Sequence, residues 1–216
     1  MEDLLSIKLP AALIFLLVSF SASAQIVPDG KFALTTAASA GSPVISSSGF
    51  PHAFDAGAVG KPIQCGEWIT GGITINTTIA AYTSPTQVTL AANAPSNSTT
   101  LQCQWGTDNT AAINNAIATI PDGGELRLPC GNIITGSINA TKRANLHLIA
   151  CGGTNNVLAY TTYPGRGTAL INNQEIYALI DWVGTNRPRL SSIQLGHTFS
   201  PVVGKTGVLF AQDNSG

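Results

Sequence analysis

Hydrophobic and polar residues alternate over several short stretches in the first half of the chain. Such alternation occurs at 73–79, 87–90 and 101–105, and it is typical of β-strands that bury one face. Residues 25–50 are rich in Ala, Ser, Thr and Gly and show little periodicity, which predicts a loose lead-in segment. Residues 51–104 are therefore predicted to form a small β-rich N-terminal region.

A helical pattern follows these stretches. One apolar stripe recurs at helical spacing, formed by Ala112, Ile113, Ala116, Ile117 and Ile120. Thr107 or Asp108 can cap the first turn, because a side-chain oxygen there accepts a free backbone N–H group. Pro121 starts a turn that ends the element. The pattern predicts a helix over about 108–120, with an apolar side that must pack on something.

Two series of short apolar segments recur after the helix, at intervals of about 20–25 residues. The first series is Leu126–Leu128, Leu146–Leu148, Ala169–Ile171 and Ile193–Leu195, and the second is Ile138, Val157–Leu158, Ala178–Ile180 and Val208–Phe210. This recurrence is typical of a solenoid, whose repeats stack to bury a continuous core. A β-sandwich is the alternative, but it gives no role to a single helix before the repeats. Residues 105–216 are thus predicted to begin a solenoid that the helix caps.

The chain ends at Gly216, shortly after the apolar segment Val208–Phe210. A solenoid needs a polar or helical cap on its last repeat, because an open sheet edge promotes aggregation. No such cap is visible in the sequence. We therefore expect an N-terminal piece of a longer protein, with a solenoid that is incomplete at its C-terminus.

The first 24 residues have the pattern of a secretory signal peptide. Lys8 precedes an apolar run from Leu9 to Phe20, and Ala22 and Ala24 suit the small-residue positions before a cleavage site after Ala24. An uncleaved membrane anchor is the alternative, but the run is shorter than the ~20 apolar residues that span a bilayer. Residues 1–24 therefore predict a secreted protein, extracellular or periplasmic, with no membrane contact after cleavage.

Four cysteines lie beyond this segment: Cys65, Cys103, Cys130 and Cys151. An even number in an exported chain favours disulfides, and three pairings are possible. Cys65–Cys103 is favoured because both lie in short strand-like segments that can face each other. Cys130–Cys151 is favoured because their separation matches one solenoid repeat. Four buried thiols are the alternative, and the absence of a CxxC pair disfavours zinc.

Charged residues are scarce, and this narrows the classes of partner. They make up 10% of the chain, which has a formal net charge of -1, against about 25% in an average soluble domain. The sequence offers no basic stripe for phosphates, so we expect no nucleic-acid partner. It also offers no Lys/Arg-rich amphipathic segment that would hold a membrane surface.

The segment around the predicted helix resembles a known family. Trp105–Ile113, Ala116-Ile117 and Gly123–Gly131 are similar to the opening of the pectate-lyase-like superfamily, which includes polygalacturonase-like proteins and phage tail-spike depolymerases. Asn109 and Cys130 depart from that opening at positions that look structural. In the family, this helix plugs the first coil of a right-handed parallel β-helix. The resemblance therefore implies an all-β fold: the first few coils of such a β-helix, an N-terminal capping α-helix and a small β-rich lead-in.

The resemblance also implies a secreted protein that degrades polysaccharides, as a lyase or a glycoside hydrolase acting on acidic glycans. Family lyases use Ca²⁺, which makes this ion a candidate cofactor without an identified site, and a tail-spike-like protein would form a homotrimer. No family catalytic motif occurs in this chain, so we expect it to lack the catalytic coils. A non-catalytic glycan-binding or surface-adhesion module is the alternative, and a non-functional fragment is a third, because fold does not fix chemistry.

Local candidates for substrate binding are few, and no catalytic residue can be named. Asp181 and Trp182 are candidates, because an aromatic ring beside a carboxylate can stack on a sugar. A strand-end Asp and a surface Trp are the more common interpretation of such a pair. Arg187-Pro188-Arg189 can meet an anionic uronate, or it forms a solvated turn.

Other polar residues give no site. Glu175 lies in a predicted loop, and nothing in the sequence places a second carboxylate at the separation that a glycosidase needs. The histidines are scattered and lack the spacing of metal ligands: His52, His147 and His197. They predict hydrogen-bonded structural residues and no metal site.

Overall fold

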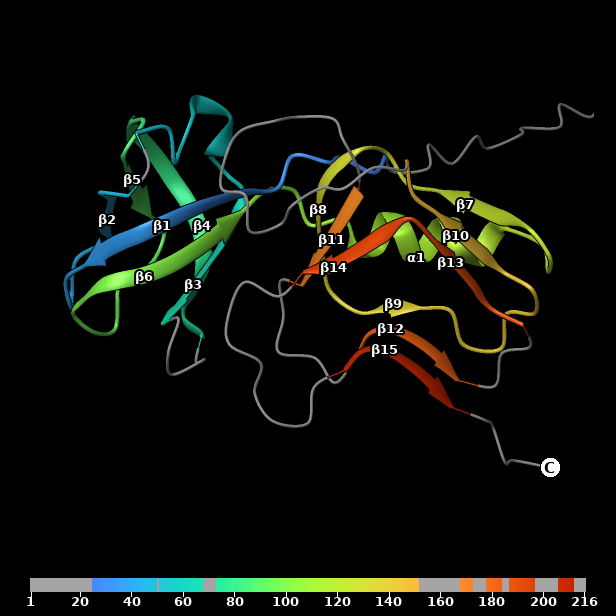
Figure 1. The fold of residues 1–216 in the computed structure, drawn as a ribbon. Helices are drawn as coiled ribbons and strands as arrows, with labels where there is room; N and C mark the ends of the chain where they lie inside the picture. The colour runs from blue at the N-terminus through green and yellow to red at the C-terminus, as the bar shows by residue number, and fades with distance from the viewer. Residues whose placement is uncertain are drawn as a thin grey trace, which may run out of the picture.

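The computed structural model describes residues 25–49, 51–67, 73–151, 168–172, 178–183, 187–196 and 206–211. These residues form two parts that lie side by side, an antiparallel barrel and a group of parallel strands with one α-helix (Figure 1). The predicted signal peptide, with Ala22 and Ala24, lies outside the described residues, as do Glu175 and His197. The described part of the chain contains no helix with the length and apolar character needed to cross a membrane.

Six strands form a closed antiparallel barrel in the order β1-β2-β5-β4-β3-β6. Their bounds are β1 (Lys31–Ala38), β2 (Val44–Ser47), β3 (Pro62–Glu67), β4 (Ile73–Ser84), β5 (Gln87–Leu90) and β6 (Ser98–Trp105). β1 and β6 close the barrel, with Lys31 opposite Trp105 at one end and Ala38 opposite Ser98 at the other. Closure removes the free edges that an open sheet of the same strands would expose.

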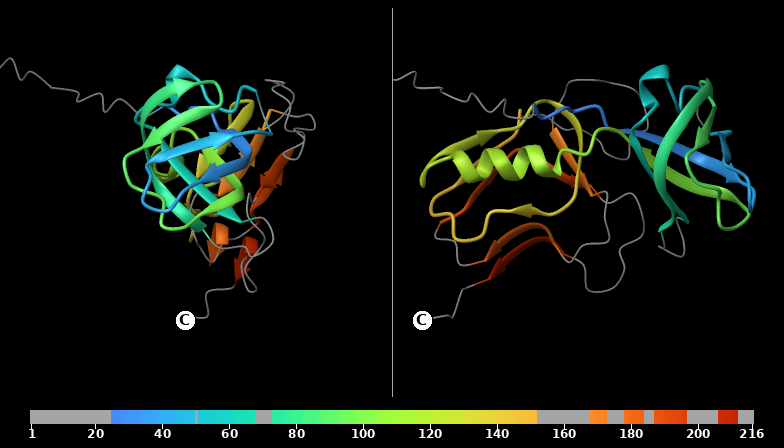
Figure 2. Two further views of the ribbon diagram at one scale, coloured as in Figure 1. Left: turned by 90° about the vertical axis from the view of Figure 1, so that its left-hand side faces the viewer. Right: turned by 180° about the vertical axis from the view of Figure 1, so that it is seen from behind.

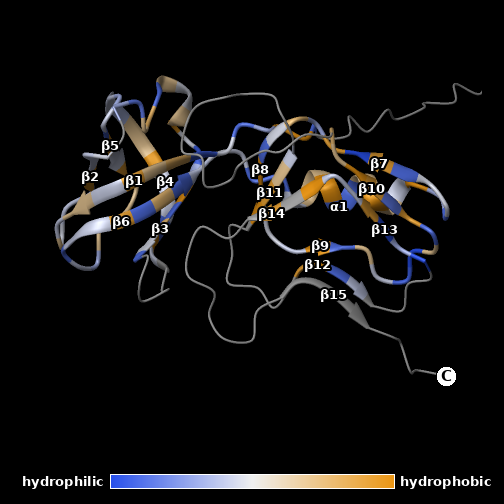
Figure 3. Ribbon diagram, in the orientation of Figure 1, coloured by the Kyte–Doolittle hydropathy of each residue, from blue (hydrophilic) through white to orange (hydrophobic). Residues whose placement is uncertain are grey.

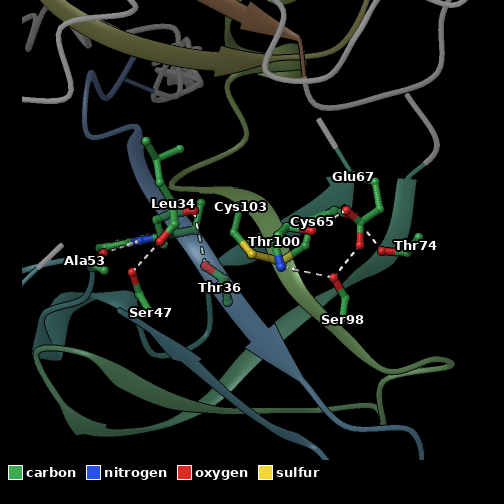
Figure 4. Close-up of a disulfide and its surroundings, with 12 residues drawn as sticks. Leu34, Thr36, Ser47, Ala53, Cys65, Glu67, Thr74, Ser98, Thr100 and Cys103 are labelled. Atoms are coloured by element: carbon green, nitrogen blue, oxygen red, sulfur yellow. Dashed lines mark hydrogen bonds between the residues drawn. A yellow bond between two sulfur atoms is a disulfide. The ribbon is translucent and has the colours of Figure 1, made fainter. Parts of the chain in front are cut away.

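Residues 25–50, predicted as a loose lead-in, contribute β1 and β2 to the barrel. The inward side chains of these strands are small or polar, apart from one isoleucine: Ala33, Thr36, Ala38, Ile45 and Ser47. The two inward hydroxyls are satisfied locally, because Thr36 donates to the Ala33 carbonyl at 3.2 Å and Ser47 donates to the Leu34 carbonyl at 2.7 Å (Figure 4). Strands with such small or polar inward residues do not show the alternation of apolar and polar residues that predicts a strand.

A disulfide joins two neighbouring barrel strands, between Cys65 in β3 and Cys103 in β6 (Figure 4). The two cysteines are directly opposite in the antiparallel register, their Cα atoms are 4.0 Å apart, and both are fully buried. A second disulfide joins Cys130 to Cys151 in the other part of the chain. The chain therefore contains two disulfides, as expected for an even number of cysteines.

Nine further strands form three parallel sheets (Figure 1). Their bounds are β7 (Glu125–Arg127), β8 (Gly131–Thr135), β9 (Ile138–Asn139), β10 (His147–Ile149), β11 (Thr168–Asn172), β12 (Ala178–Val183), β13 (Arg189–Ser191), β14 (Ile193–Gly196) and β15 (Thr206–Ala211). The chain enters the three sheets in turn, which gives the orders β13-β10-β7, β14-β11-β8 and β15-β12-β9. Neighbouring strands are in register, so residues of successive passes align in rows.

The predicted fold class is wrong. We expected the first coils of a right-handed parallel β-helix with a small lead-in, but the largest sheet is a closed antiparallel barrel and the parallel strands form three separate three-stranded sheets. The resemblance covers about residues 50–216, but its similarity upstream of the helix, at 54–55, 59–63 and 86–90, does not say how those strands pair. Alternation of apolar residues predicts strands, but it does not distinguish an open lead-in from a closed barrel.

The two predicted series of parallel strands are partly regrouped. Leu126 and Leu148 share a sheet, but Ala169–Ile171 and Ile193–Leu195 lie with β8 in the next sheet. The third strand beside Leu126 and Leu148 is β13, which the sequence pattern did not reveal because Leu190 is its single apolar residue. Val157–Leu158 lies outside the described residues.

The helix predicted over 108–120 is found as α1 (Thr110–Thr119). Ile113 and Ile117 are buried, and Ala116 and Ile120 pack against the same core. That core includes Leu126, Leu148 and Trp182 of the parallel strands. Figure 2, right, shows the helix lying against these strands, and Figure 3 shows its hydrophobic segments.

Asn109, the N-cap residue of α1, joins the helix to the N-terminal segment. Its side chain makes no capping bond. Instead, Oδ1 accepts the Val27 N–H at 2.7 Å, and Nδ2 donates to the carbonyls of Val27, Thr107 and Ile134 at 3.0, 2.8 and 3.2 Å. Asp108 caps the first turn, where its carboxylate accepts a backbone N–H at 2.9 Å. Asn109 is 1% exposed, so its bonds are shielded from water.

Asp29 connects the barrel to the second part of the chain. It forms an ion pair with Lys61 of the barrel, and its two oxygens accept the N–H and the hydroxyl of Thr107, each at 2.8 Å. Burial raises the pKa of Asp29, but the hydrogen bonds from Lys61 and Thr107 outweigh burial, so the pKa lies below its ordinary value. Next to it, the Gly30 N–H donates to the Asn132 carbonyl at 2.8 Å.

Candidate functional site

The sheet β13-β10-β7 has a buried face and an exposed face. Leu126, Leu148 and Leu190, at the centres of its three strands, are aligned in register and pack in the core that contains α1. Successive side chains of a strand point to opposite faces, so the residues on either side of each leucine lie on the outer face. The triplets Glu-Leu-Arg, His-Leu-Ile and Arg-Leu-Ser therefore present mostly polar groups to solvent.

The outward residues align in two rows across the three strands. Glu125, His147 and Arg189 form one row, and Arg127, Ile149 and Ser191 form the next. Neighbouring strands are about 4.8 Å apart, so each row extends over about 10 Å. We call the polar members of these rows the polar face: Glu125, Arg127, His147, Arg189 and Ser191.

His147 lies at the centre of the polar face and contacts residues on both neighbouring strands. Its Nε2 atom is 2.7 Å from Ser191 Oγ, a hydrogen bond, and its Nδ1 atom is 3.6 Å from Glu125 Oε1. The second distance exceeds a hydrogen bond, but it suits an ion pair when the imidazole is protonated. The other oxygen of Glu125 accepts a bond from Arg127 Nη2 at 2.9 Å. A continuous chain of contacts thus runs from Arg127 to Ser191.

Solvent reaches the polar face unequally. The side chains of Arg127, Glu125 and His147 are 75%, 46% and 20% exposed. Exposed ion pairs contribute less than about 1 kcal/mol, so the contact between Arg127 and Glu125 orients these groups more than it stabilises the fold. Arg189 is exposed, and its guanidinium forms no ion pair or hydrogen bond within the described residues. The polar face therefore carries one carboxylate and two guanidinium groups, a net positive charge.

Further basic residues lie in the turns that precede these strands. Four of the five arginines of the chain lie on this sheet or in those turns: Arg127, Arg143, Arg187 and Arg189. The Nε atom of Arg143 is 3.9 Å from Asp122 Oδ1 in the turn before β7. Its Nε and Nη2 atoms are buried, and neither has a hydrogen-bond partner in the described part of the chain. Four of the five arginines are thus concentrated on this sheet and in the turns before its strands.

Asp181 and Trp182, the residues singled out from the sequence, lie on β12 in a different sheet. Trp182 is 1% exposed and packs in the core with α1, so its ring has no open face on which a sugar could stack. Asp181 is half-buried opposite Asn139, and its Oδ1 atom has no hydrogen-bond partner among the residues described. The structure therefore does not bring these two residues together with the polar face.

The structure places the remaining residues considered from the sequence, Arg187–Arg189, His147 and His52, in different elements. Arg187 and Pro188 lie in a turn, whereas Arg189 begins β13. His147 belongs to the polar face, and His52 lies in an exposed turn of the barrel part.

The sequence pattern did not single out Glu125 or Ser191 for chemistry. A usable signal was the recurrence of a leucine between two mostly polar residues at positions 126, 148 and 190. It is weak because each triplet alone resembles a loop.

Ca²⁺ was suggested by the family resemblance alone, and the described residues do not fit it. Among them, no group of three or more His, Cys, Asp or Glu side chains could hold a metal ion. Calcium requires several oxygen ligands. Glu125 is the single carboxylate of the polar face, it binds Arg127, and the nearby guanidinium groups repel a cation.

No protein family and no curated protein matches the sequence. Among solved structures, the chain is similar to the crystal structure of the tailspike protein gp49 from Pseudomonas phage LKA1, at 12% sequence identity and a TM-score of 0.28. The similarity covers 83% of this chain and 33% of that chain, so this chain spans about a third of the length of the tailspike. At this TM-score the likeness carries no argument about fold or function.

Proposed function

We propose that this protein is an extracellular glycan-binding protein that holds an acidic polysaccharide on its polar face. The observation that carries the proposal is the exposed Arg189 guanidinium, which has no ion-pair partner among the described residues and lies in one row with His147 and Glu125. A guanidinium binds a carboxylate through two parallel N–H···O bonds. A carboxylate is the group that distinguishes an acidic sugar from a neutral one.

The remaining groups of the polar face suit a ligand rich in hydroxyls. Ser191, His147 and Glu125 offer hydrogen-bond donors and acceptors side by side. The rows extend over about 10 Å of an open sheet surface, a shape suited to a segment of a linear polymer.

Two features of the sequence support the extracellular and glycan parts of the proposal. Residues 105–131 resemble a superfamily that acts on polysaccharides. The two disulfides and the predicted signal peptide favour an oxidising compartment.

Binding is preferred to depolymerisation because a glycosidase needs two carboxylates about 5–9 Å apart. Asp181 is the single carboxylate on the described strands of its sheet, and Glu125 is the single one on the polar face. On the described strands of these two sheets, neither has a second carboxylate beside it. The described residues thus support a binding role over the acid–base pair of a glycoside hydrolase.

Calorimetric titration of the full chain with polygalacturonate tests the proposal. Arg189→Gln should weaken binding roughly tenfold to hundredfold, because a charge-assisted hydrogen bond contributes about 1.5–3 kcal/mol. Lys31→Gln makes the same change of charge on the barrel and should bind like the unaltered protein. Binding should weaken with added salt, and neutral dextran should not bind. Equal binding by Arg189→Gln and the unaltered protein, or no binding by either, rejects the proposal.

A further inference from the structure

We infer that Ser191, His147 and Glu125 form a hydrolytic site for small carboxylic esters. The three side chains come from three adjacent strands and are ordered as hydroxyl, imidazole and carboxylate. Ser191 Oγ is 2.7 Å from Nε2 of His147, and Nδ1 of the same ring is 3.6 Å from Glu125 Oε1. A nucleophile, a general base and an acid that orients the base are the parts of an acyl-transfer site.

The two ring nitrogens of His147 can take different roles. With the proton on Nδ1, facing Glu125, the Nε2 atom has a free lone pair for the Ser191 proton. Glu125 then stabilises the imidazolium that forms, and the 3.6 Å contact can shorten as that charge develops. Arg127 holds Glu125 Oε2 at 2.9 Å, which leaves Oε1 for the imidazole. Glu125 is thus a positioning residue, and Ser191 and His147 are the catalytic residues.

The backbone around Ser191 fixes the position of this half-buried nucleophile. Its carbonyl accepts the Ala150 N–H at 3.0 Å, which fixes the end of β13. Ser192 follows in a left-handed conformation with φ 58°, which it shares with four other non-glycine residues of the described part of the chain. The Ser192 N–H has no hydrogen-bond partner within the described ranges. We assign this N–H, one residue after Ser191, and the Arg189 guanidinium, two residues before it, as the donors to a developing oxyanion.

The proposed reaction balances with water as the co-reactant. Ser191 Oγ bonds to the carbonyl carbon of the ester while its proton moves to His147 Nε2. The tetrahedral intermediate collapses, the ester C–O bond breaks, and the leaving alcohol takes the proton from the imidazolium. Water then attacks the acyl-serine with its proton moving to Nε2, and release of the carboxylic acid restores Ser191 and His147.

The surroundings favour a small acyl group such as acetyl. Ile149 lies directly opposite Ser191 in the register and is the apolar member of the two outward rows. It offers a small apolar surface, and the open sheet has space for a large alcohol part. Identifying that alcohol as a sugar hydroxyl of an acidic glycan rests on the proposed function, because Arg189 would hold the glycan beside Ser191.

Two probes test the site in the full chain: a fluorophosphonate that labels activated serines, and p-nitrophenyl acetate. The label should appear on the peptide that contains Ser191, and it should be lost in Ser191→Ala and His147→Gln but kept in Ser96→Ala, an exposed serine of the barrel part. His147→Gln should lower kcat/KM by roughly 10²–10⁴-fold. Glu125→Gln should lower kcat about tenfold or more with KM unchanged, a separation that a purely structural role would not produce.

The outcomes separate this inference from the proposed function. Failure of the folded wild-type chain to react at Ser191, while it still binds polygalacturonate through Arg189, overturns the inference alone. Labelling at Ser191 without polygalacturonate binding supports the ester site and rejects the glycan ligand. Ester turnover that Ser191→Ala leaves unchanged also overturns the inference, because it comes from another group.

Discussion

The side chain of Asn109 forms hydrogen bonds with both the N–H and the carbonyl of Val27, a residue 82 positions earlier in the chain. Through these bonds one buried amide joins the N-terminal segment to the start of α1. The same amide donates to the carbonyls of Thr107 and Ile134. Every polar atom of this side chain is therefore satisfied away from water, which is the condition under which a buried amide stabilises a fold.

Replacing this amide should cost about 2–4 kcal/mol of unfolding free energy in Asn109→Ala, because several buried backbone groups lose their partners. Asn109→Asp should cost more, since a carboxylate would face carbonyl oxygens to which it cannot donate. Urea unfolding measures both. Asn115→Ala, at an exposed position of the same helix, is the control. A loss below about 0.5 kcal/mol in Asn109→Ala would contradict the role assigned to this residue.

Asp29 should make the stability of the fold depend on pH in the acid range. Its pKa in the folded chain is lowered below 3.8, so its contribution is fully present above that value and is lost as the pH falls through the folded pKa. Asp29→Asn should therefore be less stable than the unaltered protein at neutral pH, and the difference should shrink on acidification. Unfolding midpoints in urea at several pH values measure this. A difference that stays constant with pH would show that charge at Asp29 is unimportant.

The two disulfides should differ in their response to reductant. Cys65 and Cys103 are fully buried, whereas Cys130 is exposed, so dithiothreitol should open Cys130–Cys151 first. Alkylation followed by mass spectrometry identifies the order. Simultaneous opening of both bonds in the folded protein would contradict the burial argument.

Removal of the barrel disulfide by Cys65→Ala with Cys103→Ala should lower stability by about 4 kcal/mol, because it frees a loop of 38 residues. Thermal unfolding measures the loss. Cys130→Ala with Cys151→Ala, which frees 21 residues, should cost about 3 kcal/mol. Equal stability of the barrel without its disulfide would mean that this crosslink does not stabilise the fold by restricting the unfolded chain.

The apolar stripe of α1 should be a main source of stability for the parallel strands. Ile117 is 1% exposed, and Ile117→Ala should cost about 2–5 kcal/mol, as for other buried aliphatic side chains. Thr119→Ala, on the exposed side of the helix, should cost less than about 1 kcal/mol. Denaturant unfolding followed by circular dichroism compares the two variants. Similar small losses in both would mean that the helix contributes little to this core.

The helix was predictable because large aliphatic residues at helical spacing leave a strong pattern, and Ile113 and Ile117 are buried as that pattern requires. The barrel was not, for a physical reason. Its first wall places Ala33, Thr36 and Ser47 inward, and such residues fill a narrow barrel without raising hydropathy. Strand pairing in the barrel also depends on contacts between distant segments, such as β1 with β6, which periodicity does not encode.

The polar face was hidden for a different reason. His147 and Ser191 are 44 positions apart, and only the parallel register of β10 and β13 brings them to hydrogen-bond distance. The charge of Arg189 is evident in the sequence, but its place in a strand is not, because its neighbour Leu190 is the single apolar residue of β13. Asp181 and Trp182 are neighbours in the sequence, but successive strand residues point to opposite faces, so this adjacency does not make a shared site.

The closing pair of the barrel determines how the molecule would respond to mechanical tension. The chain enters the barrel at Lys31 and leaves it at Trp105, and these residues are partners in the register. A force applied between residues 25–30 and α1 would act first on the hydrogen bonds of Val27 with Asn109 and of Asp29 with Thr107, before it reached any barrel strand. Once those bonds broke, the hydrogen bonds between β1 and β6 would break one after another from the Lys31–Trp105 end, until the disulfide between Cys65 and Cys103 carried the force.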